Sequence, residues 1–183
     1  YAQLNTVAMI IDGDRIVLSD GKKIKLMGID APEKHPSPKL SRDALMRGTS
    51  IKQVMQQGEL AAEFLTQISG GSPVKLIVFR DPDPASYLPA MGYVKNQNGQ
   101  PLYCLNQRMI EARDAVADLT YDTPETQLYA RLEEEARDDM QGLWAEALIM
   151  VEPQKTRAHA ADPAIINGAC ARDSACVWVS GVG

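Results

Sequence analysis

Residues 6–33 read TVAMIIDGDRIVLSDGKKIKLMGIDAPE, and the fold prediction rests mainly on this segment. Residues 6–18 contain two runs rich in aliphatic and β-branched side chains on either side of the turn Asp12-Gly13-Asp14. Ser19-Asp20-Gly21 is a hairpin signal, and residues 22–29 alternate polar and apolar side chains as a half-buried strand does. Pro32 then ends the ladder. The stretch predicts a strand, a turn, a strand, a hairpin and a third strand.

Further along the chain, the pattern predicts both helices and strands. Leu60, Phe64 and Ile68 form one apolar stripe, which indicates an amphipathic helix over residues 58–68. We expect the chain to turn helical from about Ser41, with strands at 74–79, 87–95 and 102–105, and helices at 106–117 and 124–146. Short strands with a helix after the third are typical of a small barrel. We predict an α+β fold, a five-stranded OB-type β-barrel with about three helices, as one domain over residues 1–148 with a partly irregular tail over 149–183.

The length and composition agree with a single domain. The chain has 183 residues, of which 45% are hydrophobic and 23% charged, and a domain usually takes about 100–200 residues. No uninterrupted apolar run approaches the roughly 20 residues that a membrane span needs. The net charge of −5 argues against strong nonspecific binding to nucleic acid. The first 57 residues carry nine Lys and Arg against six Asp and Glu, so a site for a polyanion is expected there.

Four carboxylates lie at the ends of the predicted strands. Asp12 and Asp14 flank the first turn, and Asp30 and Glu33 follow the third strand. Adjacent strand ends can bring such side chains together, and hard cations such as Ca²⁺ prefer oxygen ligands. An Asp-Gly-Asp motif alone is weak evidence, because these residues also form ordinary turns. The motif is much more specific when GIDAPEK (residues 28–34) follows at this distance.

These motifs resemble those of the staphylococcal nuclease (thermonuclease-like) family over roughly residues 6–146, including IIDGDRIVL, LMGIDAPEKHP and EEEARDDMQGLW. The resemblance implies an OB barrel that hydrolyses phosphodiester bonds in DNA and RNA with Ca²⁺. It implies that Asp14 and Asp30 hold the metal, and that Glu33 is the general base for the attacking water. Tyr87 and Tyr121 match positions at which the family contacts nucleotide.

The chain departs from the family where two arginines normally bind phosphate. Lys25 stands at the first arginine position, Pro89 aligns with the second, Arg15 replaces a threonine, and Arg113 lies near an expected glycine. A guanidinium binds phosphate through a planar fork, whereas an ammonium offers one compact charge. Losing one preorganised donor commonly slows catalysis by about 10²–10³. We therefore expect hydrolysis to be weakened or lost, with Lys25 as the catalytic cation that remains.

Each candidate residue also has an alternative interpretation. Arg15 either contacts substrate or pairs with Asp14, and in the second case it takes the place of the metal electrostatically. Glu33 either acts as the base or pairs with a neighbouring lysine. Lys25 either contacts phosphate or is simply solvated, and the two tyrosines either stack on bases or cover the barrel.

Two functions therefore stay open. The first is a Ca²⁺-dependent phosphodiesterase that acts on DNA or RNA, with weakened activity. The second is a non-catalytic OB-fold module that binds nucleic acid or a protein, because a resemblance predicts the fold of a chain better than its function. We expect weak Ca²⁺ binding that depends on Asp14, a monomer, and no membrane span.

The three cysteines and the first residue bear on location. Cys104 lies in an apolar stretch and is expected to be a buried free thiol. Cys170 and Cys176 are close enough in sequence for a small-loop disulfide, which an oxidising compartment permits. The chain starts at Tyr1 rather than Met, and the family it resembles is often secreted. We expect a secreted or periplasmic protein; the alternative is a cytoplasmic protein with three thiols.

Overall fold

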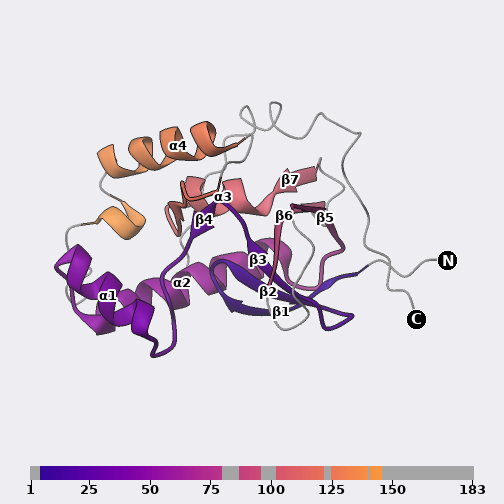
Figure 1. The fold of residues 1–183 in the computed structure, drawn as a ribbon, viewed down its shortest axis with the longest axis horizontal. Helices are drawn as coiled ribbons and strands as arrows, with labels where there is room; N and C mark the ends of the chain where they lie inside the picture. The colour runs from indigo at the N-terminus through magenta and orange to yellow at the C-terminus, as the bar shows by residue number, and fades with distance from the viewer. Residues whose placement is uncertain (1–4, 80–86, 96–101, 122–124, 140, 146–183) are drawn as a thin grey trace.

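The computed structural model describes residues 5–79, 87–95, 102–121, 125–139 and 141–145 (Figure 1). The predicted tail and its two cysteines lie outside these residues. Within them the chain has the mixed helix and strand content that the sequence predicts, so the α+β fold of the OB-like type is confirmed.

A mixed sheet forms the centre of the molecule. Its strands follow the order β1-β2-β3-β6-β5, with β7 paired to β6, and only the β3–β6 pair on this path is parallel. A second, two-stranded sheet pairs β4 with β8. The bounds are β1 Val7–Asp12, β2 Arg15–Leu18, β3 Lys23–Leu26, β4 Ile29–Asp30, β5 Val74–Val78, β6 Leu88–Lys95, β7 Leu102–Cys104 and β8 Val116–Ala117.

The two ends of the main sheet approach each other without a continuous ladder. Thr6 and Pro73 form an isolated bridge, the Val7 amide donates to the Ser72 carbonyl at 3.0 Å, and the Val74 amide donates to the Asn5 carbonyl at 3.0 Å. The described strands therefore form an OB-like sheet whose two ends meet at this bridge, without the continuous ladder of a closed barrel.

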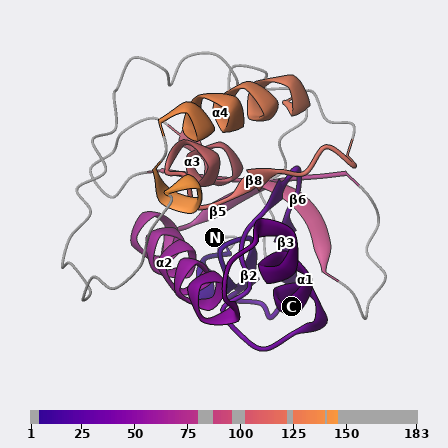
Figure 2. The same ribbon diagram turned by 90° about the vertical axis from the view of Figure 1, so that its left-hand side faces the viewer.

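The helices pack around this sheet, with α4 above α3 and with α1 beside α2 (Figures 1 and 2). Their bounds are α1 Pro38–Arg47, α2 Ile51–Ser69, α3 Leu105–Glu111 and α4 Thr126–Asp138, followed by the short 3₁₀ helix η1 Gly142–Trp144. No helix among the described ranges is both long enough and apolar enough to span a membrane.

The helix boundaries differ from the sequence prediction in three places. The region expected to turn helical from about Ser41 forms two helices, because Gly48, with φ 62°, ends α1 and a capping box of Ser50 and Gln53 starts α2. The helix expected over 124–146 is α4 over Thr126–Asp138, and Gly142–Trp144 is a separate 3₁₀ helix. Residues 112–117 are not helical, because Arg113 has φ 66° and Val116–Ala117 pairs with Ile29–Asp30.

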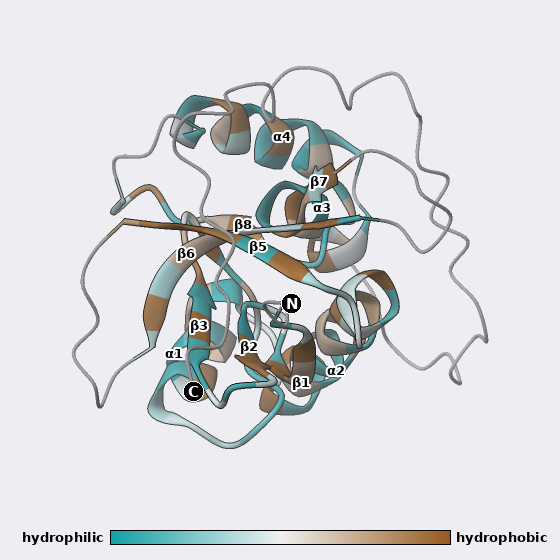
Figure 3. Ribbon diagram, turned by 90° about the vertical axis from the view of Figure 1, so that its right-hand side faces the viewer, coloured by the Kyte–Doolittle hydropathy of each residue, from teal (hydrophilic) through white to brown (hydrophobic). Residues whose placement is uncertain are grey.

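The main core lies between the sheet, α2 and α3. Ile16, Leu18, Ile24 and Leu26 point inward from β2 and β3 and are essentially buried. Their alternation leaves Arg15, Val17, Lys23 and Lys25 on the other face. On α4, hydrophilic and hydrophobic bands alternate (Figure 3), and Tyr129 and Ala136 are its buried residues. The sheet thus presents one polar face near its first turn, and this face carries the candidate site.

Candidate functional site

The turn Asp12-Gly13-Asp14 is held against the segment that follows β4. A Cβ on Gly13 would lie 2.7 Å from the Cβ atoms of both Ala31 and Ala61, so only glycine allows this close packing. The Asp14 amide donates to Asp12 Oδ1 at 3.2 Å, which closes the turn. The turn is therefore fixed between the Asp30–Glu33 segment and α2.

Asp14 connects the turn to that segment directly. Its Oδ2 atom accepts a hydrogen bond from the Ala31 amide at 2.9 Å, and the residue is 2% exposed. Gly58 of α2 makes a second close approach, because a Cβ there would lie 2.6 Å from the Glu33 carbonyl carbon. Asp12, Asp14 and Glu33 are buried and Asp30 is half-buried, so the structure brings the four predicted carboxylates together.

Lys25 and Pro89, which stand at the two arginine positions implied by the resemblance, lie in one row with Arg15 across three strands. Arg15 of β2 is in register with Lys25 of β3, and Lys25 is in register with Pro89 of β6. Pro89 has no side-chain donor. The row therefore contains two cations and one position that offers no charge.

Arg15 binds the carboxylates rather than facing solvent freely. Its Nη1 atom donates to Asp12 Oδ2 at 3.0 Å and to Glu33 Oε2 at 3.3 Å, and its Nη2 atom donates to Glu33 Oε1 at 2.9 Å. Its Nε atom lies 3.7 Å from Asp14 Oδ1. The pairing of Arg15 with Asp14, one of the two alternatives for Arg15, is thus present, and Glu33 accepts its hydrogen bonds from Arg15 rather than from a neighbouring lysine.

Two lysines complete the charge balance. The Lys25 ammonium pairs with Asp14 Oδ2 and lies 3.8 Å from Asp30 Oδ1. The Lys39 ammonium of α1 lies 3.3 Å from Asp30 Oδ2 and 2.9 Å from Asp43 Oδ2. Five carboxylates thus share three cations. We call these eight residues the carboxylate cluster: Asp12, Asp14, Asp30, Glu33 and Asp43 with Arg15, Lys25 and Lys39.

Burial and these charges move the pKa values of the cluster in opposite directions. Burial, aided by the negative charge of Asp14, raises the pKa of Asp12 to about 7. Burial by itself would raise the pKa of Asp14, but Lys25 and the Ala31 amide hold the pKa of that carboxyl below its ordinary value. Burial raises the pKa of Asp30, and Lys39 and Lys25 offset only part of this effect. Near neutral pH, Asp14 is the anion of the turn and Asp12 readily takes the proton.

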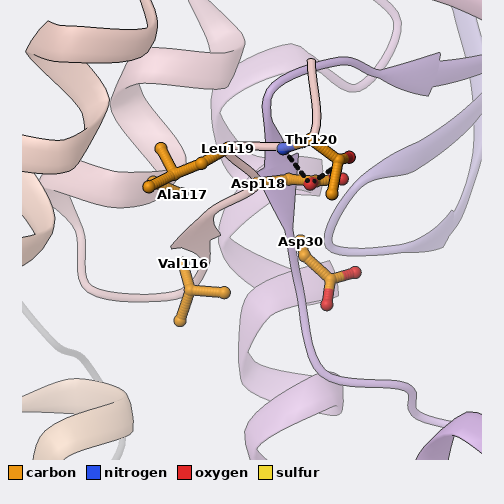
Figure 4. A pocket seen from close by; sticks show the side chains of 6 residues that line it. All are labelled: Asp30, Val116, Ala117, Asp118, Leu119 and Thr120. Atoms are coloured by element: carbon orange, nitrogen blue, oxygen red, sulfur yellow. Dashed lines mark hydrogen bonds between the residues drawn. The ribbon is translucent and has the colours of Figure 1, made fainter.

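The two tyrosines differ in their relation to the cluster. The Tyr87 ring centroid lies 5.7 Å from the Arg15 guanidinium carbon and 6.0 Å from the Lys23 ammonium, within cation–π range. Tyr121 comes directly after Thr120, one of the residues that line a surface cavity of about 540 Å³. The Tyr121 carbonyl accepts a hydrogen bond from Thr126 Oγ1 at 2.9 Å. That cavity adjoins the cluster through Asp30 (Figure 4), and its lining consists of Asp30, Val116, Ala117, Asp118, Leu119 and Thr120.

The comparison with protein families agrees with this geometry. The model of the staphylococcal nuclease homologue family matches residues 23–146, about two thirds of the chain. The chain belongs to the staphylococcal nuclease homologue family. The matched range contains Lys25, Asp30, Glu33 and Pro89 but begins after the Asp12-Gly13-Asp14 turn, which the fold brings to the same place. No curated protein matches the chain.

Membership of this nuclease-like family raises the question of whether the cluster fits calcium. Ca²⁺ takes about six to eight oxygen ligands at roughly 2.3–2.6 Å. Here the oxygens of Asp14 and Asp30 already accept from ammonium groups and a backbone amide. Among the described residues, no group of three or more His, Cys, Asp or Glu is arranged to hold a metal ion. The cluster as it stands does not fit a bound calcium ion.

Sequence reasoning missed two members of the cluster, Lys39 and Asp43. The sequence feature that could have indicated this ion pair is the i, i+4 spacing of opposite charges on one helix. It was missed because the first turn of α1 was not predicted to be helical. Ser37 caps α1 by accepting from the Leu40 amide at 3.0 Å, and this start of the helix aims Lys39 at the Ala31 carbonyl, 2.9 Å away.

Proposed function

We propose that this nuclease-like protein binds single-stranded nucleic acid and hydrolyses its phosphodiester bonds far more slowly than a member of its family with both arginines, or not at all. One observation carries the proposal. Both Glu33 oxygens accept hydrogen bonds from Arg15, and Glu33 is 8% exposed. A base in this state has little capacity left for a water molecule.

The chemistry of phosphoryl transfer makes this arrangement costly. Catalysis there is mainly positioning and stabilisation of charge on the phosphoryl oxygens. Pro89 supplies no donor, and the Lys25 ammonium is bound to Asp14 and close to Asp30. Each missing donor is expected to slow hydrolysis by about 10²–10³.

The same face retains features suited to binding a polyanion. Lys23 is exposed, and its ammonium lies 6.0 Å from the centroid of the Tyr87 ring. Aromatic rings next to cations are a common combination at sites for single-stranded nucleic acid. Binding is therefore expected to weaken steeply as the salt concentration rises.

A cleavage assay tests the proposed loss of hydrolysis. Single-stranded DNA and RNA are incubated with wild type and with the double variant Lys25→Arg/Pro89→Arg, with calcium and with EDTA. The double variant should cleave at least about 10²-fold faster than wild type. Lys52→Arg, at an exposed position of α2 outside the row, is the matched control and should behave like wild type. Rapid cleavage by wild type that Glu33→Gln abolishes would refute the proposal.

A second candidate is a non-catalytic module whose ligand is a protein. The ion pairs of the site favour this candidate. Each of the carboxylates Asp12, Asp14, Asp30 and Glu33 is paired with a lysine or arginine of the same chain, so this face of the sheet needs no external counter-ion. Gel-shift titrations in EDTA separate the two candidates. Retention of single-stranded DNA or RNA at low salt supports the first, and no retention at any salt concentration supports the second.

A further inference from the structure

The Lys25 ammonium lies among oxygen atoms of the carboxylates that would otherwise be available to a cation. It donates to Asp14 Oδ2 and, at 3.2 Å, to the Ile29 carbonyl, and it lies 3.8 Å from Asp30 Oδ1. Its side chain is only 18% exposed. An oxygen set made of two carboxylates and a carbonyl is one that hard cations prefer.

Lys39 supplies a second ammonium to the adjoining oxygens. It donates to the Ala31 carbonyl at 2.9 Å and to Asp43 Oδ2 at 2.9 Å, and lies 3.3 Å from Asp30 Oδ2 and 4.0 Å from Glu33 Oε1. Each carboxylate oxygen of Asp30 therefore has one ammonium group near it, that of Lys25 at Oδ1 and that of Lys39 at Oδ2. The two lysines come from β3 and α1, so separate parts of the fold converge on one carboxylate.

We propose that Lys25 and Lys39 act as built-in counter-cations that hold Asp14 and Asp30 together and compete with calcium for them. Calcium then binds weakly to the wild type, because it must displace an ammonium group or sit beside one. Two cations about 4 Å apart repel strongly outside bulk water. Removing Lys25 leaves the buried Asp14 with only the Arg15 Nε atom, 3.7 Å from Oδ1, as a cationic neighbour, and a divalent cation can then take the place of the ammonium on Oδ2. The inference rests on the proposed function only in that it concerns the same site.

Calcium titration calorimetry on three proteins tests this competition. Lys25→Gln should bind Ca²⁺ at least about tenfold more tightly than wild type. Lys23→Gln is the matched control, because it removes the same charge from the same strand at an exposed position. It should bind Ca²⁺ within about threefold of wild type. Adding Asp14→Asn to Lys25→Gln should abolish the gain.

Thermal unfolding gives an independent readout. Lys25→Gln should unfold at a lower temperature than wild type in EDTA, and calcium should recover much of the loss, whereas calcium should barely change wild type. If Lys25→Gln does not fold in either condition, Lys39→Gln decides: tighter calcium binding than wild type supports the proposal, and unchanged binding overturns it. Tight, Asp14-dependent calcium binding by wild type, or equal affinities of wild type and Lys25→Gln, also overturns it. These readouts contain no nucleic acid, so they fail or succeed separately from the proposed function.

Discussion

Gly58 sits in the interior of α2, where replacement by alanine would ordinarily stabilise the protein. Glycine in a helix interior costs about 0.5–1 kcal/mol relative to alanine. Here the added Cβ would lie 2.6 Å from the Glu33 carbonyl carbon, 2.7 Å from the Glu33 oxygen and 2.7 Å from the Lys34 nitrogen. These are backbone atoms, so the Cβ cannot be accommodated by rotating a side chain.

The expected sign of the effect is therefore reversed. Overpacking of this kind costs about 1–3 kcal/mol, which exceeds the gain in helix propensity. We expect Gly58→Ala to lower the free energy of unfolding by about 1–2 kcal/mol and the melting temperature by about 3–8 °C. It should also push the Glu33 backbone away from α2 and loosen the contact between Glu33 and Arg15.

Differential scanning calorimetry and urea denaturation measure the change. Glu59→Ala is the matched control, because Glu59 is the next residue of the same helix and is exposed; it should stay within about 0.5 kcal/mol of wild type. If Gly58→Ala melts at a higher temperature than wild type, α2 does not press on the Glu33–Lys34 backbone as described, and the reasoning fails.

Three further predictions concern other parts of the chain. Arg113→Gly should raise the free energy of unfolding by about 0.5–1 kcal/mol, because φ 66° strains a residue with a side chain and the ion pair with Asp139 is partly exposed; a lower melting temperature would contradict this. Asp12 keeps its proton to about pH 7 in the folded state but loses it near its ordinary pKa when unfolded. The free energy of unfolding of wild type should therefore fall between about pH 4 and 7 relative to Asp12→Asn, and parallel pH curves in urea denaturation would refute the shift. Thiol titration of unreduced, denatured protein should find one reactive thiol, Cys104, if Cys170 and Cys176 are bridged in an exported protein, whereas three thiols would remove that argument for export.

The sequence predicted the strands well because their side chains alternate. In β2 and β3 the alternation places Ile16, Leu18, Ile24 and Leu26 inward, and the structure confirms this face. The Asp-Gly-Asp turn and the segment ending in Glu33 were predictable as neighbours, since both follow strand ends in the same hairpin region.

Other features depend on contacts that no local pattern reveals. The end of α3 at Glu111 reflects the pairing of Val116–Ala117 with Ile29–Asp30, which are far away in sequence. Lys39 reaches the carboxylate cluster only because α1 is capped at Ser37 and packs on α2. The partner of Glu33 was also missed, because the register of β2 with β3 decides which cation faces it.

The α1 helix has a small apolar contact of its own, formed by Leu40, Ala44 and Val54 with Met55 beside them, and separate from the main core. A segment that buries so little apolar surface is expected to open at a lower free energy than the sheet does. Lys39 would leave with it, and Asp30 would then be exposed to solvent with one ammonium fewer. Amide hydrogen exchange in α1 would accordingly be faster than in the buried part of α2, and the electrostatics of the cluster would fluctuate on the timescale of that local opening.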